Sequence, residues 1–173
     1  MLKKITLIGS GNVAHNLGHT FLAHGFEIDE IYSRTSKNAK KLAEKLKSNY
    51  TCELSEINKK SDLYIIAASD DAIEEIAEQL NLKNKLIVHT SGSVGIEVLK
   101  SVSSNYGSFY PLQTFTQSHL ADISQVPFCI EGNTKENKIA LMELATKLSS
   151  KVIEMDSAQR RSLHLAAVFT SNF

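Results

Sequence analysis

Short apolar runs alternate with stretches of helical period along about the first hundred residues. The β-branched-rich run at 5–8, ended by Gly9, is typical of a buried strand. Helical spacing follows, and Gly25 suits the left-handed position that ends such a helix. Further strands are predicted at 26–32, 50–54, 63–68, 86–89 and near Phe109, with intervening helices from Ser36, from Asp70 or Asp71, and through Ile96 and Val102. Ser36 and one of the two aspartates are predicted N-caps. The alternation predicts an α/β fold with a Rossmann-type, doubly wound, mostly parallel sheet.

The pattern changes after Pro111, where 113–125 is polar and irregular and predicts a surface loop. Strands are predicted at 128–130 and 152–155, flanking a helix over 135–148. A last helical pattern begins at Ser157 and reaches Phe173 without the glycine, basic turn or polar tail that usually ends a helix. We expect the chain to stop inside the first helix of an all-α C-terminal domain, with the domains at 1–155 and 156–173. A helix that frays at a free terminus is the alternative.

Composition narrows the function classes. The 19 Lys and Arg balance 19 Asp and Glu, which argues against a nucleic-acid-binding protein. The two cysteines form no CxxC pair, and the histidines and acids show no zinc spacing, so we predict no metal. No apolar run is long enough to span a bilayer, and no signal peptide fits before the first strand. We therefore expect a cytoplasmic protein with no membrane contact.

A G-x-G-x-x-A sequence directly follows the first predicted strand and opens a helix: Gly9, Ser10, Gly11, Asn12, Val13 and Ala14. In dinucleotide sites Gly9 would make the tight turn, Gly11 would let the backbone approach a pyrophosphate, and Ala14 would allow close packing of helix on strand. The helix N-terminus would offer free N–H groups to the phosphates. A plain glycine turn, or a loop that binds S-adenosylmethionine, is the alternative.

The second predicted strand ends in Ser33, Arg34 and Thr35. An NAD site usually has a carboxylate here for the ribose 2′-OH, whereas Asp29 and Glu30 lie earlier. A guanidinium flanked by hydroxyls suits the 2′-phosphate of NADP. We therefore predict NADP as the cofactor; an ordinary solvated arginine is the alternative.

The loops after the later strands line the ligand crevice in a doubly wound sheet. They contain Ala68 and Ser69, then Ser91 and Gly92, and later Tyr110. Ser91 and Gly92 are small enough to face a nicotinamide ribose and a substrate oxygen. We interpret His89 as the polar end of the strand predicted at 86–89.

The terminal helix places His164 and Ser171 seven residues apart on one face, with Asn172 one residue further round. These groups could polarise a carbonyl or donate a proton. A histidine on an amphipathic interface helix is the alternative. His15, His19 and His24 lie off the apolar stripe of the first helix, so we expect them to face solvent.

Six segments together resemble the Rossmann-like NADP oxidoreductases with a helical C-terminal domain of unknown function. They are 9–14, 33–35, 68–73, 89–93, 110–115 and 164–169. Pyrroline-5-carboxylate reductase, the deazaflavin-dependent NADP reductases, and the 3-hydroxyisobutyrate and 6-phosphogluconate dehydrogenases are similar at greater distance. The resemblance implies an NADP-binding domain, then a helical domain from near Asp156 that usually forms a homodimer. His164 stands near the catalytic lysine of the hydroxyacid dehydrogenases, and Tyr110 replaces a common histidine.

These observations lead us to expect an NADP(H)-dependent oxidoreductase acting on a small carbonyl or imine substrate. The expected catalytic residues are His164, Ser91 and Asn172. The expected cofactor-binding residues are Gly9, Ser10, Gly11, Asn12, Val13, Ser33, Arg34, Thr35, Ala68, Ser69, Ser91 and Gly92. A dinucleotide-binding sensor or scaffold without turnover is the alternative, because the chain shows no unambiguous acid–base pair; a methyltransferase is a third.

Overall fold

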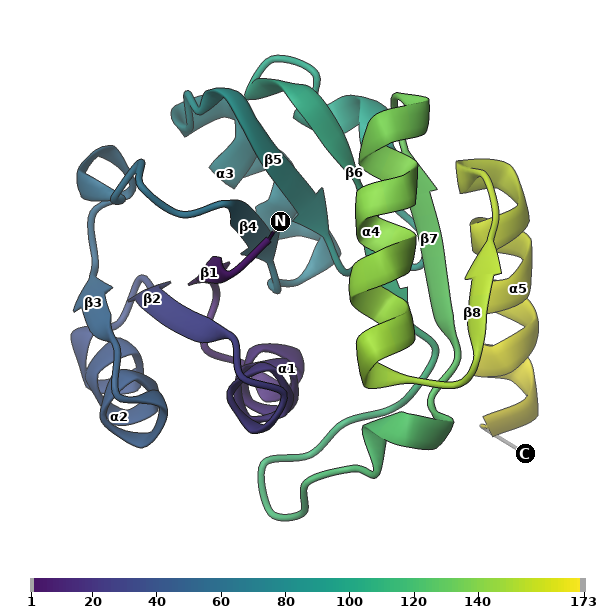
Figure 1. The fold of residues 1–173 in the computed structure, drawn as a ribbon, viewed down its shortest axis with the longest axis horizontal. Helices are drawn as coiled ribbons and strands as arrows, with labels where there is room; N and C mark the ends of the chain where they lie inside the picture. Colours follow the sequence, from purple (N-terminus) through teal and green to yellow (C-terminus); the bar gives the residue numbers. More distant parts are fainter. Residues whose placement is uncertain (1, 172–173) are drawn as a thin grey trace.

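A computed structural model describes residues 2–171, which form one eight-stranded sheet covered by helices (Figure 1). The strands are β1 (Lys4–Ile8), β2 (Glu27–Tyr32), β3 (Asn49–Thr51), β4 (Leu63–Ile66), β5 (Lys83–His89), β6 (Ser103–Pro111), β7 (Phe128–Gly132) and β8 (Val152–Glu154). The α-helices are α1 (Asn12–Ala23), α2 (Ser36–Leu46), α3 (Asp70–Gln79), α4 (Lys135–Leu148) and α5 (Ser157–Ser171). Three short 3₁₀ helices are η1 (Leu54–Glu56), η2 (Ile96–Leu99) and η3 (Ile123–Gln125).

The strand order is β3-β2-β1-β4-β5-β6-β7-β8. Strands β1 to β6 are parallel to one another, β7 is antiparallel to β6, and β8 is parallel to β7. The chain starts in the middle of the sheet, runs out to β3 and then crosses back to β4. The predicted doubly wound, mostly parallel fold is confirmed, and its topological switch point lies between β1 and β4, where such folds bind ligands.

Both faces of the sheet are buried at its central strands. In β1, Leu7 belongs to the core that includes Leu17 of α1, and Ile8 belongs to the separate core that includes Ile73 of α3. In Figure 1, α4 lies in front of the sheet and α3 behind it. Because helices cover both faces, successive residues of a strand must be apolar, which explains the continuous apolar runs of the sequence.

The predicted helix through Ile96 and Val102 is wrong. This segment forms only η2, a single turn from Ile96 to Leu99. The Val102 N–H then bonds to the Leu99 carbonyl, and β6 starts at Ser103. The apolar residues remain buried, because one turn is enough to place them against the sheet.

Two predicted N-caps are also wrong. The α3 N-cap is Ser69, and Asp70 is instead the first residue of the helix and accepts a hydrogen bond from Ser93 Oγ. In α2 the N-cap is Thr35, and Ser36 begins the helix. Neither cap side chain bonds to the helix, so these N-terminal N–H groups have no local side-chain partner. Gly25 does adopt a positive φ, 79°, after α1 as predicted.

The expectation that His15 faces solvent is wrong, since its side chain is only 5% exposed. The cause lies on the same helix at Gly18, where an added side chain would overlap Leu46 of α2. The missing side chain therefore lets α2 approach α1 closely, and His15 is covered as a result.

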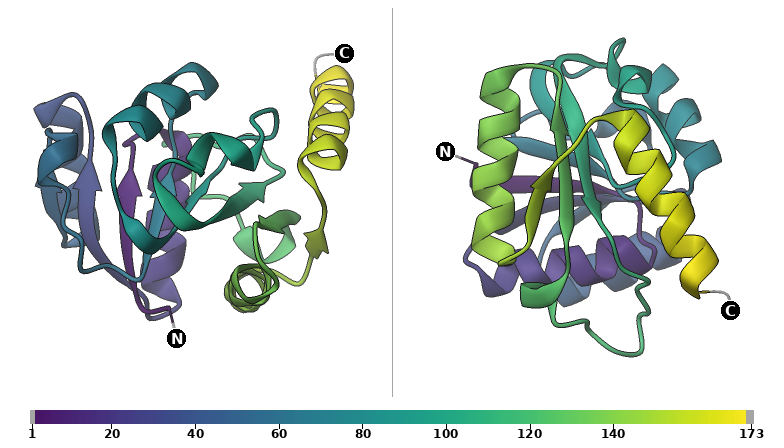
Figure 2. Two further views of the ribbon diagram at one scale, coloured as in Figure 1. Left: turned by 90° about the horizontal axis from the view of Figure 1, so that it is seen from above. Right: turned by 90° about the vertical axis from the view of Figure 1, so that its right-hand side faces the viewer.

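Helix α5 follows β8 and runs along the outside of the fold, in yellow in Figure 2. Asn172 and Phe173 lie outside the described residues, as does Met1. No helix within residues 2–171 combines the length and apolar character needed to cross a bilayer.

Candidate functional site

The glycine motif forms the turn between β1 and α1. Gly9 has a φ of 128°, and a side chain there would overlap the Ala67 carbonyl of the neighbouring chain segment. Nothing lies within 4 Å of the position where Gly11 would carry a Cβ, so the backbone is open to a ligand at that point. Gly11 is also the N-cap of α1 and supplies no side-chain cap. The first N–H groups of α1 therefore face a space where an anion can approach the backbone.

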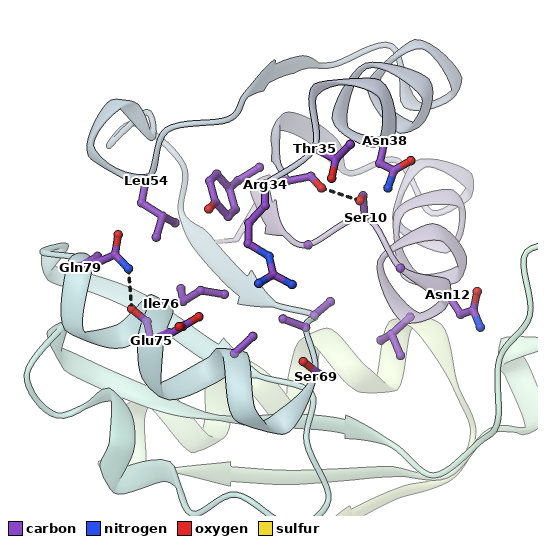
Figure 3. A pocket seen from close by; sticks show the side chains of 18 residues that line it. Ser10, Asn12, Arg34, Thr35, Asn38, Leu54, Ser69, Glu75, Ile76 and Gln79 are labelled. Atoms are coloured by element: carbon purple, nitrogen blue, oxygen red, sulfur yellow. Dashed lines mark hydrogen bonds between the residues drawn. The ribbon is translucent and has the colours of Figure 1, made fainter.

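The turn opens into a cleft of about 420 Å³ at the carboxyl ends of the central strands (Figure 3). Ten of the predicted cofactor residues line this cleft: Gly9, Ser10, Gly11, Asn12, Val13, Ser33, Arg34, Thr35, Ala68 and Ser69. The other two, Ser91 and Gly92, do not line it. The fold thus brings together three segments that are far apart in the sequence, as the switch-point position requires.

The β2 end of the cleft carries hydroxyl groups and one cation. Ser10 Oγ donates a hydrogen bond to Ser33 Oγ (2.8 Å), which ties the glycine turn to the end of β2. Figure 3 shows the Arg34 side chain reaching from β2 into the middle of the cleft, with Thr35 at the rim. Burial raises the pKa of the nearby Tyr32 phenol, whereas the Arg34 charge opposes the rise. The guanidinium is exposed and therefore available to a ligand.

The acids of β2 are used elsewhere. Asp29 Oδ2 accepts hydrogen bonds from Asn58 Nδ2 (2.6 Å) and Ser61 Oγ (3.1 Å). Glu30 Oε2 accepts from the Asn58 backbone N–H (2.8 Å), and burial raises the pKa of this carboxyl. Neither of these two acids lines the cleft, where a carboxylate at the tip of this strand would select NAD.

Further lining residues were not predicted. Leu54, Ala72 and Ile76 give the cleft an apolar wall, and Asn38, Glu75 and Gln79 complete its rim. Glu75 and Ile76 lie a turn or more into α3. Their place in the cleft depends on how α3 packs against β4, which the spacing of apolar residues does not reveal.

A second group of polar side chains lies where α5 crosses the loop after β5. His164 Nδ1 is 2.8 Å from the Tyr110 hydroxyl at the end of β6. Burial raises the pKa of Tyr110 to about 12, so the phenol keeps its proton at neutral pH. An added Cβ on Gly92 would lie 2.5–2.7 Å from three His164 atoms. The absence of a side chain at Gly92 is therefore what admits the imidazole.

The structure describes only part of the predicted catalytic set. Ser91 Oγ accepts hydrogen bonds from the backbone N–H groups of Ser93 (3.1 Å) and Val94 (3.0 Å), so its hydroxyl shapes the loop. The catalytic assignment of Ser91 stays a prediction. Asn172, also predicted as catalytic, lies outside the described residues.

His89, at the end of β5, is fully buried beside this loop. Its Nδ1 accepts a hydrogen bond from the Ser91 N–H (3.2 Å). Burial, followed by the positive charge of Arg160, lowers the pKa of His89 to about 4. The ring is therefore neutral at physiological pH, and His89 supports the loop.

Arg160 is the residue that sequence reasoning missed. Its side chain is 0% exposed, and it forms an ion pair with Glu131 of β7. Its Nε donates to the Ser91 carbonyl (3.1 Å), and its Nη2 donates to the Val94 carbonyl (2.6 Å). Arg160 thus fastens α5, and with it His164, to the loop after β5. The sequence does not distinguish this buried arginine from the adjacent Arg161, which is exposed. It therefore carries no clear signal for the role of Arg160.

Within residues 2–171, no group of three or more His, Cys, Asp or Glu side chains is placed to hold a metal ion.

Comparison of the sequence with known protein families agrees with the geometry of the cleft. The sequence profile described as NADP oxidoreductase, coenzyme F420-dependent, matches residues 4–92, which contain the glycine turn and Arg34. The chain belongs to this family. A second profile, a domain of unknown function (DUF2520), matches residues 126–173. No curated protein matches the chain.

Solved structures extend the likeness over nearly the whole chain. A Bacteroides fragilis protein provisionally named an NADP oxidoreductase is 42% identical, with a TM-score of 0.93 over 99% of this chain and 67% of that one. Protein TM1727 from Thermotoga maritima is 25% identical, with a TM-score of 0.78 over 98% of this chain and 64% of that one. A reductive aminase from Aspergillus terreus, solved with NADPH, cyclohexanone and allyl amine, shares the fold: 17% identity and a TM-score of 0.76, over 99% of this chain and 62% of that one. The present chain thus spans about two thirds of the length of each of these three proteins.

Proposed function

We propose that this member of the NADP oxidoreductase family transfers a hydride between NADP(H) and a small carbonyl or imine compound. The observation that carries the choice of NADP(H) is the Arg34 guanidinium, which lies in the cleft just beyond the end of β2, whereas neither Asp29 nor Glu30 of that strand lines the cleft. The name of the Bacteroides protein supports the choice, and the ligands of the Aspergillus reductive aminase support a carbonyl or imine substrate.

The residues of the cleft fit the pyrophosphate, the 2′-phosphate and the adenine of this cofactor. The open backbone at Gly11 and the free N–H groups of α1 suit the pyrophosphate. Ser33, Arg34 and Thr35 supply donors for the 2′-phosphate, and a guanidinium matches phosphate oxygens with two parallel hydrogen bonds. Leu54 and Ile76 offer an apolar surface to the adenine.

The His164–Tyr110 pair is suited to handle a proton at the substrate. When bound, the cofactor supplies the hydride, and the product of carbonyl or imine reduction also needs a proton. The Tyr110 hydroxyl oxygen would accept from His164 Nδ1–H, so that the imidazolium form of His164 carries one proton on each ring nitrogen. His164 would then give its Nε2 proton to the substrate and return to the neutral imidazole, with Gly92 beside the ring and Tyr110 orienting it.

The test is calorimetric titration of the wild type and Arg34→Ala with NADPH and with NADH at one ionic strength. Loss of a charged bidentate contact should weaken NADPH about tenfold or more and leave NADH nearly unchanged. Lys37→Ala is the control, because Lys37 is a nearby cation outside the cleft. Equal losses for both cofactors in Arg34→Ala would refute the 2′-phosphate assignment. Tight NADPH binding without oxidation by any carbonyl or imine would favour a sensor.

A further inference from the structure

A separate groove of about 210 Å³ lies between α1 and α2, beside the glycine turn. Its walls include His15 from α1, Lys41 and Lys45 from α2, and Gln117 from the loop after β6. Ser10, Gly11 and Asn38 line both this groove and the cofactor cleft. Figure 3 shows Ser10 and Asn38 at the rim of the cleft, on the side where α1 and α2 meet. We call this second cavity the α1–α2 groove.

The charge of the α1–α2 groove is uncompensated. Lys41 and Lys45 are one helical turn apart, so their ammonium groups share a face and repel each other. Among the ion pairs formed within residues 2–171, none includes Lys41 or Lys45, and no carboxylate lines the groove. By contrast, Lys40 on the same helix pairs with Glu44 (4.0 Å). Two like charges therefore line one groove whose other lining residues include no carboxylate.

The histidine in the groove reinforces this arrangement. Lys45 Nζ lies 3.3 Å from His15 Nε2. An ammonium can only donate, so Nε2 accepts and the imidazole is neutral with its proton on Nδ1. Burial, and then the charges of His19, Lys45 and Lys41, lower the pKa of His15. The buried Nδ1 has no hydrogen-bond partner in the structure. Every charged or titratable group that acts on His15 here is basic, so an anion would relieve the mutual repulsion.

We propose that the α1–α2 groove is a binding site for a phosphate dianion, distinct from the Ser33–Thr35 group. Its volume is several times the ~30 Å³ occupied by a water molecule, so a phosphate fits. Lys41 and Lys45 would neutralise the charge, and the Asn38 and Gln117 amides add neutral donors. The phosphate can be a free one, or it can belong to NADP(H), because the groove adjoins the cleft.

The first measurement is calorimetric titration with inorganic phosphate, at constant ionic strength, of the wild type and of Lys41→Gln/Lys45→Gln. The matched control is Lys37→Gln/Lys40→Gln, which removes two charges from the same helix but outside the groove. Circular dichroism verifies that all three proteins are folded. We expect phosphate affinity to fall at least tenfold in Lys41→Gln/Lys45→Gln and to stay within twofold in the control.

The second measurement identifies the source of the phosphate by titrating the same proteins with NADPH and NADH. If the groove lysines share the 2′-phosphate of NADP(H) with Ser33, Arg34 and Thr35, Lys41→Gln/Lys45→Gln loses NADPH affinity and keeps NADH affinity. If it holds a free phosphate, only phosphate affinity falls and the NADPH-to-NADH ratio is unchanged. The proposal is overturned if the two double variants agree within twofold for both phosphate and NADPH. If the protein binds neither nucleotide but binds phosphate through Lys41 and Lys45, the proposed phosphate site stands and the proposed function is refuted.

Discussion

Substitution of Arg160 tests what holds helix α5 against the rest of the fold. Four groups surround the guanidinium: the Glu131 carboxylate, the carbonyls of Ser91 and Val94, and Ser157 Oγ (3.2 Å). Arg160→Met keeps much of the side-chain volume and removes every one of these donors. Apart from Ser157, which lies on α5 itself, the partners come from β7 and from the loop after β5, so the substitution removes the bonds that this guanidinium makes to both.

The magnitude follows from burial. In Arg160→Met the Glu131 carboxylate, whose side chain is only 15% exposed, loses its cation, and two carbonyls lose a donor. Removal of one partner from a buried ion pair typically costs about 3–5 kcal/mol, because the other charge stays desolvated and uncompensated. Since domains are stable by only about 5–15 kcal/mol, this loss is a large share of the total. We therefore expect the free energy of unfolding to fall by about 3–5 kcal/mol.

The assay is urea unfolding followed by circular dichroism. Arg161→Met is the matched control: Arg161 is exposed and makes one hydrogen bond, from Nε to the Ser93 carbonyl (3.1 Å). It should cost less than about 1 kcal/mol. Adding Glu131→Gln to Arg160→Met should recover part of the loss, because the uncompensated charge is then gone. If Arg160→Met costs no more than Arg161→Met, the buried pair is not what holds α5.

Two further substitutions probe the same region. Under the proposed function, Gly92→Ala should displace the His164 ring and lower the rate of substrate reduction at least tenfold, because misplacing a group that acts on the substrate by about 1 Å can cost ~10²-fold. NADPH affinity should stay within twofold, since Gly92 does not line the cleft. Steady-state kinetics and calorimetry measure the two quantities, and an unchanged rate would contradict the proposed role of His164. His89 is neutral in the folded state with its pKa lowered to about 4, so the unfolded chain takes up a proton first as pH falls below about 6.5. Stability should therefore decline by about 3 kcal/mol between pH 6.5 and 4 through His89 alone. Urea unfolding of His89→Gln across this range should lack that decline, and an identical slope in both proteins would exclude His89 as its source.

The alternation of strands and helices was predictable because it depends on local spacing. The runs at 5–8 and 63–68 are apolar throughout, as strands covered on both faces must be. Gly9 was predictable for a related reason, since a tight turn at a positive φ tolerates few other residues. Both features depend on only a few consecutive residues.

The first residues of the helices, and the partners and burial of individual polar side chains, were less predictable. Asp70 and Ser36 are both good N-cap residues, yet each lies one position inside its helix. Asp70 bonds instead with Ser93, a residue from another loop, and such a partner outweighs a modest local preference. His15 was misplaced because its burial depends on the close approach of α2, set by Gly18 and Leu46.

The sequence alone determined the strand pattern, the glycine turn and the cation at the end of β2, because spacing and residue type act over one turn or one strand. Only the tertiary structure could decide that Arg160 is buried, that Tyr110 meets His164, and that two lysines of α2 flank a groove. Arg160 and Ser91 are 69 residues apart, and Tyr110 and His164 are 54 apart. Such contacts depend on how the sheet brings distant loops to one edge, and no local pattern of apolar and polar residues encodes that meeting.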